Sequence, residues 1–167
     1  PVLSVPTCYR QDLSLDMPGM RRIVELGISS GCGIVTLTAG NNQYDLLNYD
    51  EIKDLTREII DAVDGRAVMI AATGKWETDQ AVDYAKFATE LGADALQVTL
   101  PALDDDRMIG HFAAITSATP VGIVLHGDPP MPLISRLLEM ESVVAFKEEY
   151  NTIYSLQLYR SFGKRIT

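Results

Sequence analysis

The sequence predicts an α/β protein built on a parallel β-sheet. Each predicted strand is a mostly apolar run, without the polar alternation of an exposed antiparallel sheet, and a helical repeat of apolar residues separates it from the next strand. Parallel strands joined by right-handed crossovers produce this order. The chain holds six such strand–helix units and the start of a seventh. That number fits an open doubly wound sheet, or a (β/α)₈ barrel lacking its last units, because a complete barrel needs about 250 residues.

The first half of the chain carries clear helix signals. Asp16 precedes a helix whose first turn holds Pro18, where a helix tolerates proline. Asn48 and Glu51 have the spacing of a capping box, so a helix is expected to begin there. Thr78 begins the next helical repeat. The predicted strands are residues 2–5, 34–38 and 67–72, and the predicted helix ends are Gly31, Gly65 and Gly92.

The second half repeats the pattern. The acidic run of residues 104–106 suits the positive end of a helix dipole and predicts a helix start. Two strands end in residues that carry chemistry, His126 and Lys147. The predicted strands are residues 95–100, 121–125, 143–146 and the start of one at 165–167, and the predicted helices are 104–117, 133–140 and 152–161.

The composition is that of a globular domain. Hydrophobic residues make up 47% and charged residues 22% of the 167 residues, which is ordinary for one domain with a sizeable core. We therefore expect a single domain over residues 1–167. Because the chain opens at Pro1 and stops at Thr167, where a strand begins, we expect a fragment or the ordered part of a longer chain.

The net charge and the cysteine spacing indicate which kinds of binding partner and which cellular setting to expect. The net charge is −9 and no basic patch is evident, so neither nucleic acid nor an anionic membrane surface is expected as a partner. Cys8 and Cys32 lack the spacing of metal ligands or of a disulfide framework. With no signal peptide and no apolar run long enough for a bilayer, the sequence predicts a reduced, cytoplasmic setting.

Lys147 is the main catalytic candidate. The apolar run of residues 143–146 predicts a short strand buried on both faces, and it leads directly into this lysine. Carboxyl ends of parallel strands are where ligands bind, and a desolvated lysine there has a lowered pKa and can attack a carbonyl to form a Schiff base. The alternative is that Lys147 ends the strand, points into water and pairs with Glu148 or Glu149.

Other candidates also follow strands. Residues 38–43 form a loop of small and polar residues whose amides could hold a carboxylate or phosphate oxygen, or which is an ordinary turn. His126 could shuttle protons or be a hydrogen-bonded structural histidine, and His111, inside a helix beside Phe112, is interpreted as structural. Trp76 could close over a ligand or pack at a subunit interface. The aspartates at 104–106 are interpreted as a solvated helix start rather than a metal site.

The order of these motifs resembles the dihydrodipicolinate synthase / N-acetylneuraminate lyase family, Schiff-base aldolases on a (β/α)₈ barrel. Residues 143–148, Val-Val-Ala-Phe-Lys-Glu, are similar to the family's Schiff-base strand, Ile-Val-Gly-Ile-Lys-Glu. Residues 39–43 occupy the place of its Gly-Thr-Thr-Gly-Glu loop, and residues 90–95 that of its Ala-Gly-Ala-Asp-Ala turn. The remaining matches are residues 14–16 with 21–25, residues 47–51 and residues 111–115. The resemblance runs over essentially the whole chain.

The departures from the family pattern concern hydroxyl groups. The family's paired threonines, which hold a keto-acid carboxylate and relay a proton, fall on Gly40 and Asn41. Its Tyr-Asn-Val-Pro segment, whose tyrosine is the general acid/base, falls near residues 126–129, which begin with His126. Its Pro-Pro-Tyr-Tyr segment becomes residues 100–103, without tyrosine, and the stretch before Lys147 is shorter and lacks its Gly-Arg-Thr-Gly segment.

The resemblance implies a Schiff-base lyase, an aldolase or synthase or a dehydratase, acting on pyruvate or another 2-keto acid. Lys147 would form the imine and His126 would shuttle protons, while Gly40, Asn41 and Asn42 would hold the carboxylate. No metal or organic cofactor is implied, and a homotetramer or dimer is expected. Two alternatives stay open: a catalytically lapsed paralogue that binds a small carboxylic acid without turnover, and an unrelated α/β binding domain.

Overall fold

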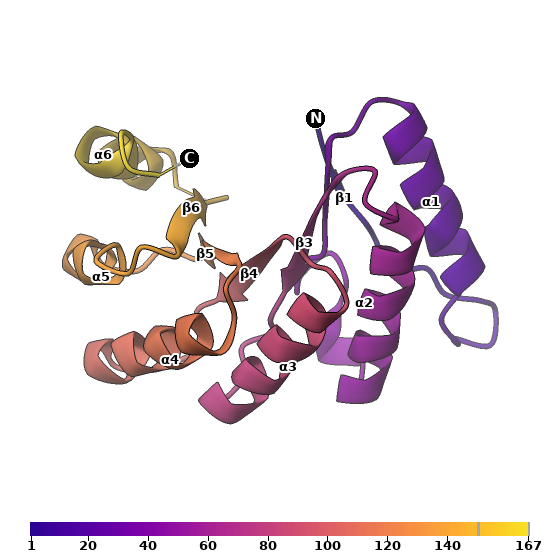
Figure 1. Cartoon of the computed structure of the whole chain (residues 1–167), viewed down its shortest axis with the longest axis horizontal. Helices are drawn as coiled ribbons and strands as arrows, with labels where there is room; N and C mark the ends of the chain where they lie inside the picture. Colours follow the sequence, from indigo (N-terminus) through magenta and orange to yellow (C-terminus); the bar gives the residue numbers. More distant parts are fainter. Residues whose placement is uncertain (150, 167) are drawn as a thin grey trace.

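The computed structural model describes residues 1–149 and 151–166 as one curled sheet of six parallel strands covered by helices on its outer side (Figure 1). The strands follow one another in chain order, β1-β2-β3-β4-β5-β6. They are β1 (Val2–Ser4), β2 (Ile34–Thr36), β3 (Val68–Ala72), β4 (Ala95–Thr99), β5 (Gly122–His126) and β6 (Val143–Lys147). Sequential parallel order with helices on one face is the arrangement of a (β/α)₈ barrel, of which six units are present, as the sequence predicts.

The helices begin and end close to their predicted positions. They are α1 (Met17–Ser29), α2 (Tyr49–Val63), α3 (Thr78–Glu90), α4 (Asp105–Ala118), α5 (Met131–Leu137) and α6 (Thr152–Phe162), with a short 3₁₀ helix η1 (Tyr44–Leu46) before α2. The fifth helix begins two residues earlier than expected, because Pro130 and Pro132 suit the entry to a helix. No helix in residues 1–149 and 151–166 is long and apolar enough to cross a membrane.

The predicted helix caps are formed. The Asp16 side chain accepts a hydrogen bond from Gly19 N at 3.1 Å, and Asn48 and Glu51 bond each other reciprocally in a capping box. Gly92 follows α3 with a φ of +102°, a left-handed conformation that only glycine adopts without strain. These contacts satisfy backbone groups that a helix end leaves unpaired, and they set where each unit turns back to the sheet.

The predicted seventh strand is not formed by the residues described there. Arg165 lies in a turn, and its amide bonds Phe162 O at 2.8 Å. Ile166 N bonds the same carbonyl at 3.2 Å, so both residues continue the end of α6 instead of extending. Thr167, the last residue of that prediction, lies outside the described residues.

The core lies between the sheet and the helices, in two clusters of buried apolar side chains. One packs β1–β3 against α1 and α2, with Met20 and Ile59 at its centre. The other packs the later strands against α3–α6, with Tyr84 and Phe112 fully buried. Alternation along each strand sends one set of side chains into these clusters and the other set to the concave face.

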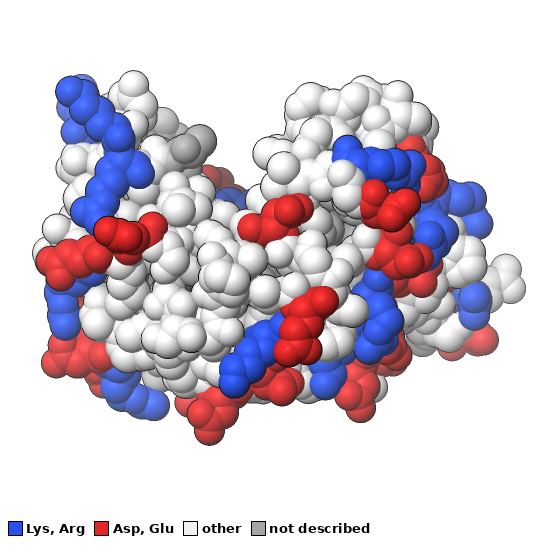
Figure 2. All heavy atoms as spheres, in the orientation of Figure 1, with Lys and Arg blue, Asp and Glu red and all other residues white. Residues whose placement is uncertain are grey.

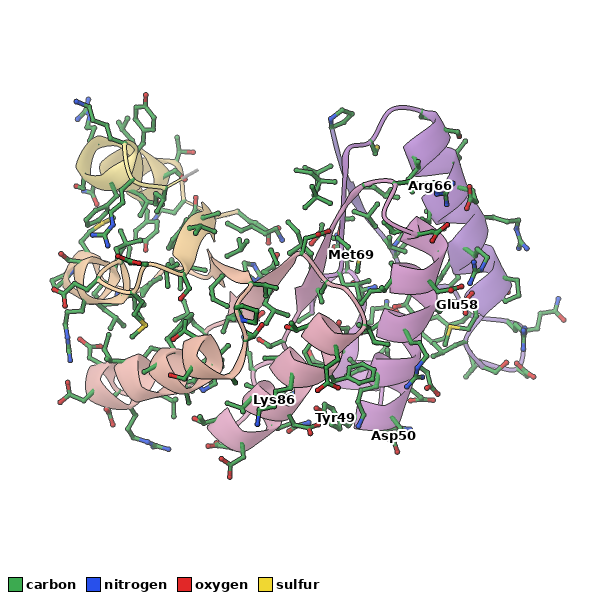
Figure 3. All side chains as sticks on the ribbon, viewed as in Figure 1. Tyr49, Asp50, Glu58, Arg66, Met69 and Lys86 are labelled. Carbon is green, nitrogen blue, oxygen red and sulfur yellow. The ribbon has the colours of Figure 1, made fainter. Side chains whose placement is uncertain are left out.

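The outer surface of α1 and α2 carries a group of charged side chains of both signs, visible in Figure 2. Arg21 on α1 bonds Glu58 on α2 at 2.8 Å, and Arg66 at the end of α2 pairs with Glu25 on α1 at 2.5 Å. Figure 3 labels Glu58 and Arg66 beside α1. Exposed pairs of this kind contribute little stability, about 0–1 kcal/mol each. They lie away from the strand ends and take no part in the site.

The prediction that residues 143–146 are buried on both faces is wrong. Val144 is 44% exposed, whereas Val143 is 3% exposed. The physical reason is the shape of the sheet: the helices cover its outer side, and no further layer covers its concave face among residues 1–149 and 151–166. Val2 and Val68 lie on the face of the sheet that points away from the core. They are also exposed, by 58% and 46%. The concave face of the curled sheet therefore presents apolar surface.

Candidate active site

The carboxyl ends of β4, β5 and β6 bring the predicted catalytic residues together. His126 and Lys147 are register partners on neighbouring strands, and Thr99 is the partner of His126 on the other side. Register partners in parallel strands project to the same face of a sheet. The sequence predicts that His126 and Lys147 lie at the same edge of the sheet. In the structure they are direct neighbours on adjacent strands.

Lys147 ends β6 with its ammonium group held by a carboxylate. Its Nζ pairs with Glu149 Oε1, and its side chain is 29% exposed. Glu149 is one of the two partners predicted for a lysine that merely ends the strand. The lysine side chain is also largely shielded from water, and it is the register partner of His126. The hydrogen bond from Lys147 is the main cause that lowers the pKa of Glu149 below its ordinary 4.5.

His126 is poised as a neutral imidazole. Its Nδ1 lies 3.2 Å from Gln97 Nε2, an amide nitrogen that donates hydrogen bonds, so Nδ1 accepts and the ring proton resides on Nε2. Nε2 in turn lies 3.4 Å from Glu149 Oε2. Burial, and then the positive charge of Lys147, lower the pKa of His126 below its ordinary 6.5, against the opposing effect of Glu149. The ring is therefore neutral at pH 7 and can accept a proton.

Buried polar side chains beneath His126 hold it in place, and no sequence motif identified above includes them. Gln97 is 1% exposed and Thr99 is 6% exposed. Thr99 Oγ1 donates to Thr73 O at 3.0 Å, and Thr99 N donates to Thr73 Oγ1 at 3.1 Å. A glutamine within the apolar run 95–100 is the signal that could have identified this support, because buried polar groups need partners.

The loop predicted to hold a carboxylate uses most of its amides internally. Asn42 N donates to Thr38 O at 2.9 Å, and Asn41 N donates to Thr38 Oγ1 at 3.2 Å. Gly40 N has no hydrogen-bond partner among residues 1–149 and 151–166. The Asn41 side chain is exposed and donates to Ser4 Oγ at 2.7 Å. Gly40 and the Asn41 side chain thus remain available to a ligand.

Asn42 has a structural role. Its side chain is fully buried, accepts from Thr38 N at 2.7 Å and donates to Val5 O at 2.9 Å. Its carbonyl accepts from Thr7 Oγ1 at 2.8 Å. These bonds join the ends of β1 and β2, and the fully buried side chain of Asn42 presents no exposed donor to a ligand. The predicted carboxylate contact of Asn42 is therefore not carried into the proposal below.

The different settings of Asn41 and Asn42 are testable. We expect Asn42→Ala to lower the free energy of unfolding by about 2 kcal/mol, because it leaves two buried backbone groups unpaired. Asn41→Ala, at an exposed position, should change it by less than about 0.5 kcal/mol. Urea denaturation of the two variants measures both values, and equal effects would contradict this assignment.

A cavity of about 580 Å³ opens beside His126 at the carboxyl ends of β2–β5. Its walls include Gly40, Lys75, Trp76, Thr99 and His126. Lys147 does not line it, since its amine is turned to Glu149. Figure 2 shows the molecule indented between the part that carries α5 and α6 and the part that carries α1. A volume of this size accommodates a small substrate.

Aromatic rings build one wall of the cavity. Trp76 stacks parallel to Tyr44 with ring centroids 6.0 Å apart and meets the edges of Tyr49 and Tyr84. Tyr49, labelled in Figure 3, reaches from α2 to donate to Asp83 on α3 at 2.7 Å. Of the two roles considered for Trp76, its position in the wall favours contact with a ligand.

The remaining candidates have structural settings. His111 is 2% exposed, and its Nδ1 lies 3.0 Å from Thr78 Oγ1, consistent with a structural histidine. Asp104 caps α4 through Arg107 N at 3.0 Å, and Asp106 pairs with Arg136 at 2.9 Å, which confirms the helix-start interpretation. Among residues 1–149 and 151–166, no three His, Cys, Asp or Glu side chains are grouped as metal ligands.

Comparison with known proteins decides the family. The model of the Dihydrodipicolinate synthetase family matches residues 2–167. The chain belongs to this family. Curated members of the dihydrodipicolinate synthetase family resemble it at the level of sequence. It is 30% identical over 141 residues to 4-hydroxy-tetrahydrodipicolinate synthase of Chelativorans sp. (strain BNC1), covering 83% of this chain and 48% of the relative.

A second family member, 4-hydroxy-tetrahydrodipicolinate synthase of Anaplasma marginale (strain Florida), is 30% identical over 155 residues. That match covers 87% of this chain and 52% of the relative. The chain thus spans about half the length of the curated dihydrodipicolinate synthetase family members that it matches.

Solved structures share the fold. CdNal from Clostridium difficile, in complex with mannosamine, superposes with a TM-score of 0.91 at 19% identity, over 98% of this chain and 61% of that one. YagE, a prophage protein from E. coli K12 of the dihydrodipicolinic acid synthase family, in complex with pyruvate, gives 0.88 at 20% identity, over 98% and 59%. The six units of this chain therefore correspond to a portion of these family barrels.

Proposed function

We propose that the protein is a Schiff-base-forming lyase that acts on pyruvate or another 2-keto acid. The observation that carries the proposal is the pairing of Lys147 with His126 at the carboxyl ends of β5 and β6. Membership of the Dihydrodipicolinate synthetase family supports it, and so does the pyruvate bound to YagE, a structural neighbour. The cavity wall that includes His126 and Gly40 provides room for such an acid.

Imine formation begins at Lys147. The neutral amine attacks the keto carbon, the C–N bond forms, and the carbonyl oxygen leaves as water. The product is a protonated imine, which draws electrons from the neighbouring carbon. That carbon can then lose a proton or break a bond to carbon or oxygen, and the electron pair moves into the C–N system. Carbon–carbon and carbon–oxygen cleavage are both served by this intermediate.

His126 is the proposed proton shuttle. As a neutral imidazole in the wall of the cavity, it exchanges one of its ring contacts, with Gln97 or Glu149, for the substrate. It then removes a proton from the carbon beside the imine and later returns it. Glu149, 3.4 Å from its Nε2, offsets the positive charge that the ring then gains. Gly40 N–H and the Asn41 side chain are the donors proposed to hold the substrate carboxylate.

The functional unit is proposed to be a closed barrel in a cytoplasmic homo-oligomer, a tetramer or a dimer. Exposed valines on the concave face, including Val2 and Val68, would pack inside a closed barrel. We therefore expect the full-length protein to supply about two further β/α units.

The second candidate function is a lapsed paralogue that binds a small carboxylic acid without turnover. The observations that favour it are that Lys147 is tied to Glu149 outside the cavity wall and that Gly40 and Asn41 carry no hydroxyl group. Under this alternative a keto acid occupies the cavity without reaching the amine.

Borohydride trapping distinguishes the two. The full-length protein is incubated with pyruvate and a panel of 2-keto acids, reduced, digested and analysed by mass spectrometry. We expect an irreversible adduct on Lys147, and the acid that traps best identifies the substrate class. A folded protein that forms no adduct with any keto acid, yet binds one by calorimetry, would leave the lapsed paralogue as the explanation.

A further inference from the structure

Glu149 joins the two proposed catalytic residues. Two positions beyond Lys147, it places Oε1 on Lys147 Nζ and Oε2 3.4 Å from His126 Nε2. One carboxylate oxygen therefore serves each partner. The side chain is 37% exposed, so it is neither buried in the core nor free in solution.

The contact creates a chemical requirement. A lysine ammonium group, –NH₃⁺, has no lone pair with which to attack a carbonyl. Some base must remove a proton before the C–N bond forms. Among residues 1–149 and 151–166, Glu149 is the carboxylate that contacts Nζ. The two ring nitrogens of His126 contact Gln97 and Glu149 and do not contact Lys147 Nζ.

The neighbouring carboxylate has other contacts. Glu148 Oε1 accepts from Asn151 N at 2.7 Å, and Glu148 Oε2 accepts from Ser155 Oγ, so this side chain ties the end of β6 to the start of α6. Glu148 and Glu149 are therefore adjacent residues of the same type with different contacts. The pair offers a matched comparison for an experiment.

We propose that Glu149 is the proton-transfer group for imine formation on Lys147, an inference that rests on the proposed function. The carboxylate takes a proton from the ammonium, the freed lone pair forms the C–N bond, and the carbonyl electron pair moves to oxygen. Glu149 gives its proton to that oxygen, then takes a second proton from the nitrogen and delivers it to the departing hydroxyl. An ammonium and a ketone thus become a protonated imine and water, and Glu149 ends as a carboxylate.

The experiment measures the rate of imine formation between the full-length protein and pyruvate by timed borohydride quenching. At pH 7 we expect Glu149→Gln to slow it by about 10²-fold or more, because the amide keeps the size but accepts no proton. Glu148→Gln should trap at close to the wild-type rate.

A second variant guards against misfolding. Glu149→Ala should form the imine slowly. Added formate should restore the rate of imine formation, because this small carboxylate can occupy the space left by the side chain. Slow trapping by Glu149→Ala with no rescue by formate would indicate a structural role and overturn the inference. Wild-type rates in both Glu149 variants would overturn it too, while leaving the Schiff-base proposal intact. Absence of any adduct in the wild type would overturn both.

Discussion

Replacement of Lys147 by alanine is expected to abolish the keto-acid adduct and to reduce turnover by roughly 10⁴-fold or more, the scale on which enzymes lose activity with their nucleophile. The reason is that Lys147 supplies the amine that forms the imine, and it is the register partner of His126 at the end of β6. Trapping by mass spectrometry measures the adduct, and product formation from the best-trapping acid measures turnover.

The control for this prediction is Lys147→Arg. A guanidinium keeps the positive charge and can pair with Glu149, yet it stays protonated and forms no imine. Both variants should unfold at nearly the wild-type denaturant concentration, because a partly exposed ion pair contributes about 1 kcal/mol or less. An adduct that survives in Lys147→Ala would place the imine on a different lysine and contradict the assignment.

Replacement of His126 by asparagine should separate imine formation from proton transfer. The variant keeps Lys147 and is expected to trap pyruvate. Exchange of the pyruvate methyl hydrogens for deuterium, followed by NMR, should fall by about 10²- to 10⁴-fold, the usual contribution of a general base. His111→Asn is the matched control, because His111 is bonded to Thr78 away from the strand ends. Its exchange rate per folded molecule should be unchanged.

The exchange reaction should also depend on pH through His126. Burial and the charge of Lys147, with a smaller effect of Lys75, lower the pKa of this ring below 6.5, and Glu149 raises it. A base works when it is unprotonated, so exchange should be fully active at pH 7 and decline as pH falls below 6.5 through the pKa in the folded protein. His126→Asn should lack this decline, and retention of the decline would assign it to another group.

Most of the local structure follows from interactions between residues that are close in sequence. The capping box of Asn48 and Glu51 and the glycine at 92 act within one helical turn, so the residues concerned are adjacent in the chain. The apolar runs ending at His126 and Lys147 predicted two strands of one parallel sheet. The rule that parallel strands end at one edge then brought both residues to a single site.

The side-chain contacts of the site depend on residues that are distant in sequence. They also depend on which of several chemically similar groups forms a given hydrogen bond or ion pair. Glu148 and Glu149 are chemically alike, and the turn after β6 directs one to Ser155 and the other to Lys147. The Asn42 side chain is buried at the end of β1, where it donates to Val5 O. Val144 is exposed because no further layer covers the concave face of the sheet among residues 1–149 and 151–166. The sequence pattern of a strand predicts how its side chains alternate between the two faces of the sheet. The partner of a polar side chain, however, is determined by how different β/α units pack against each other.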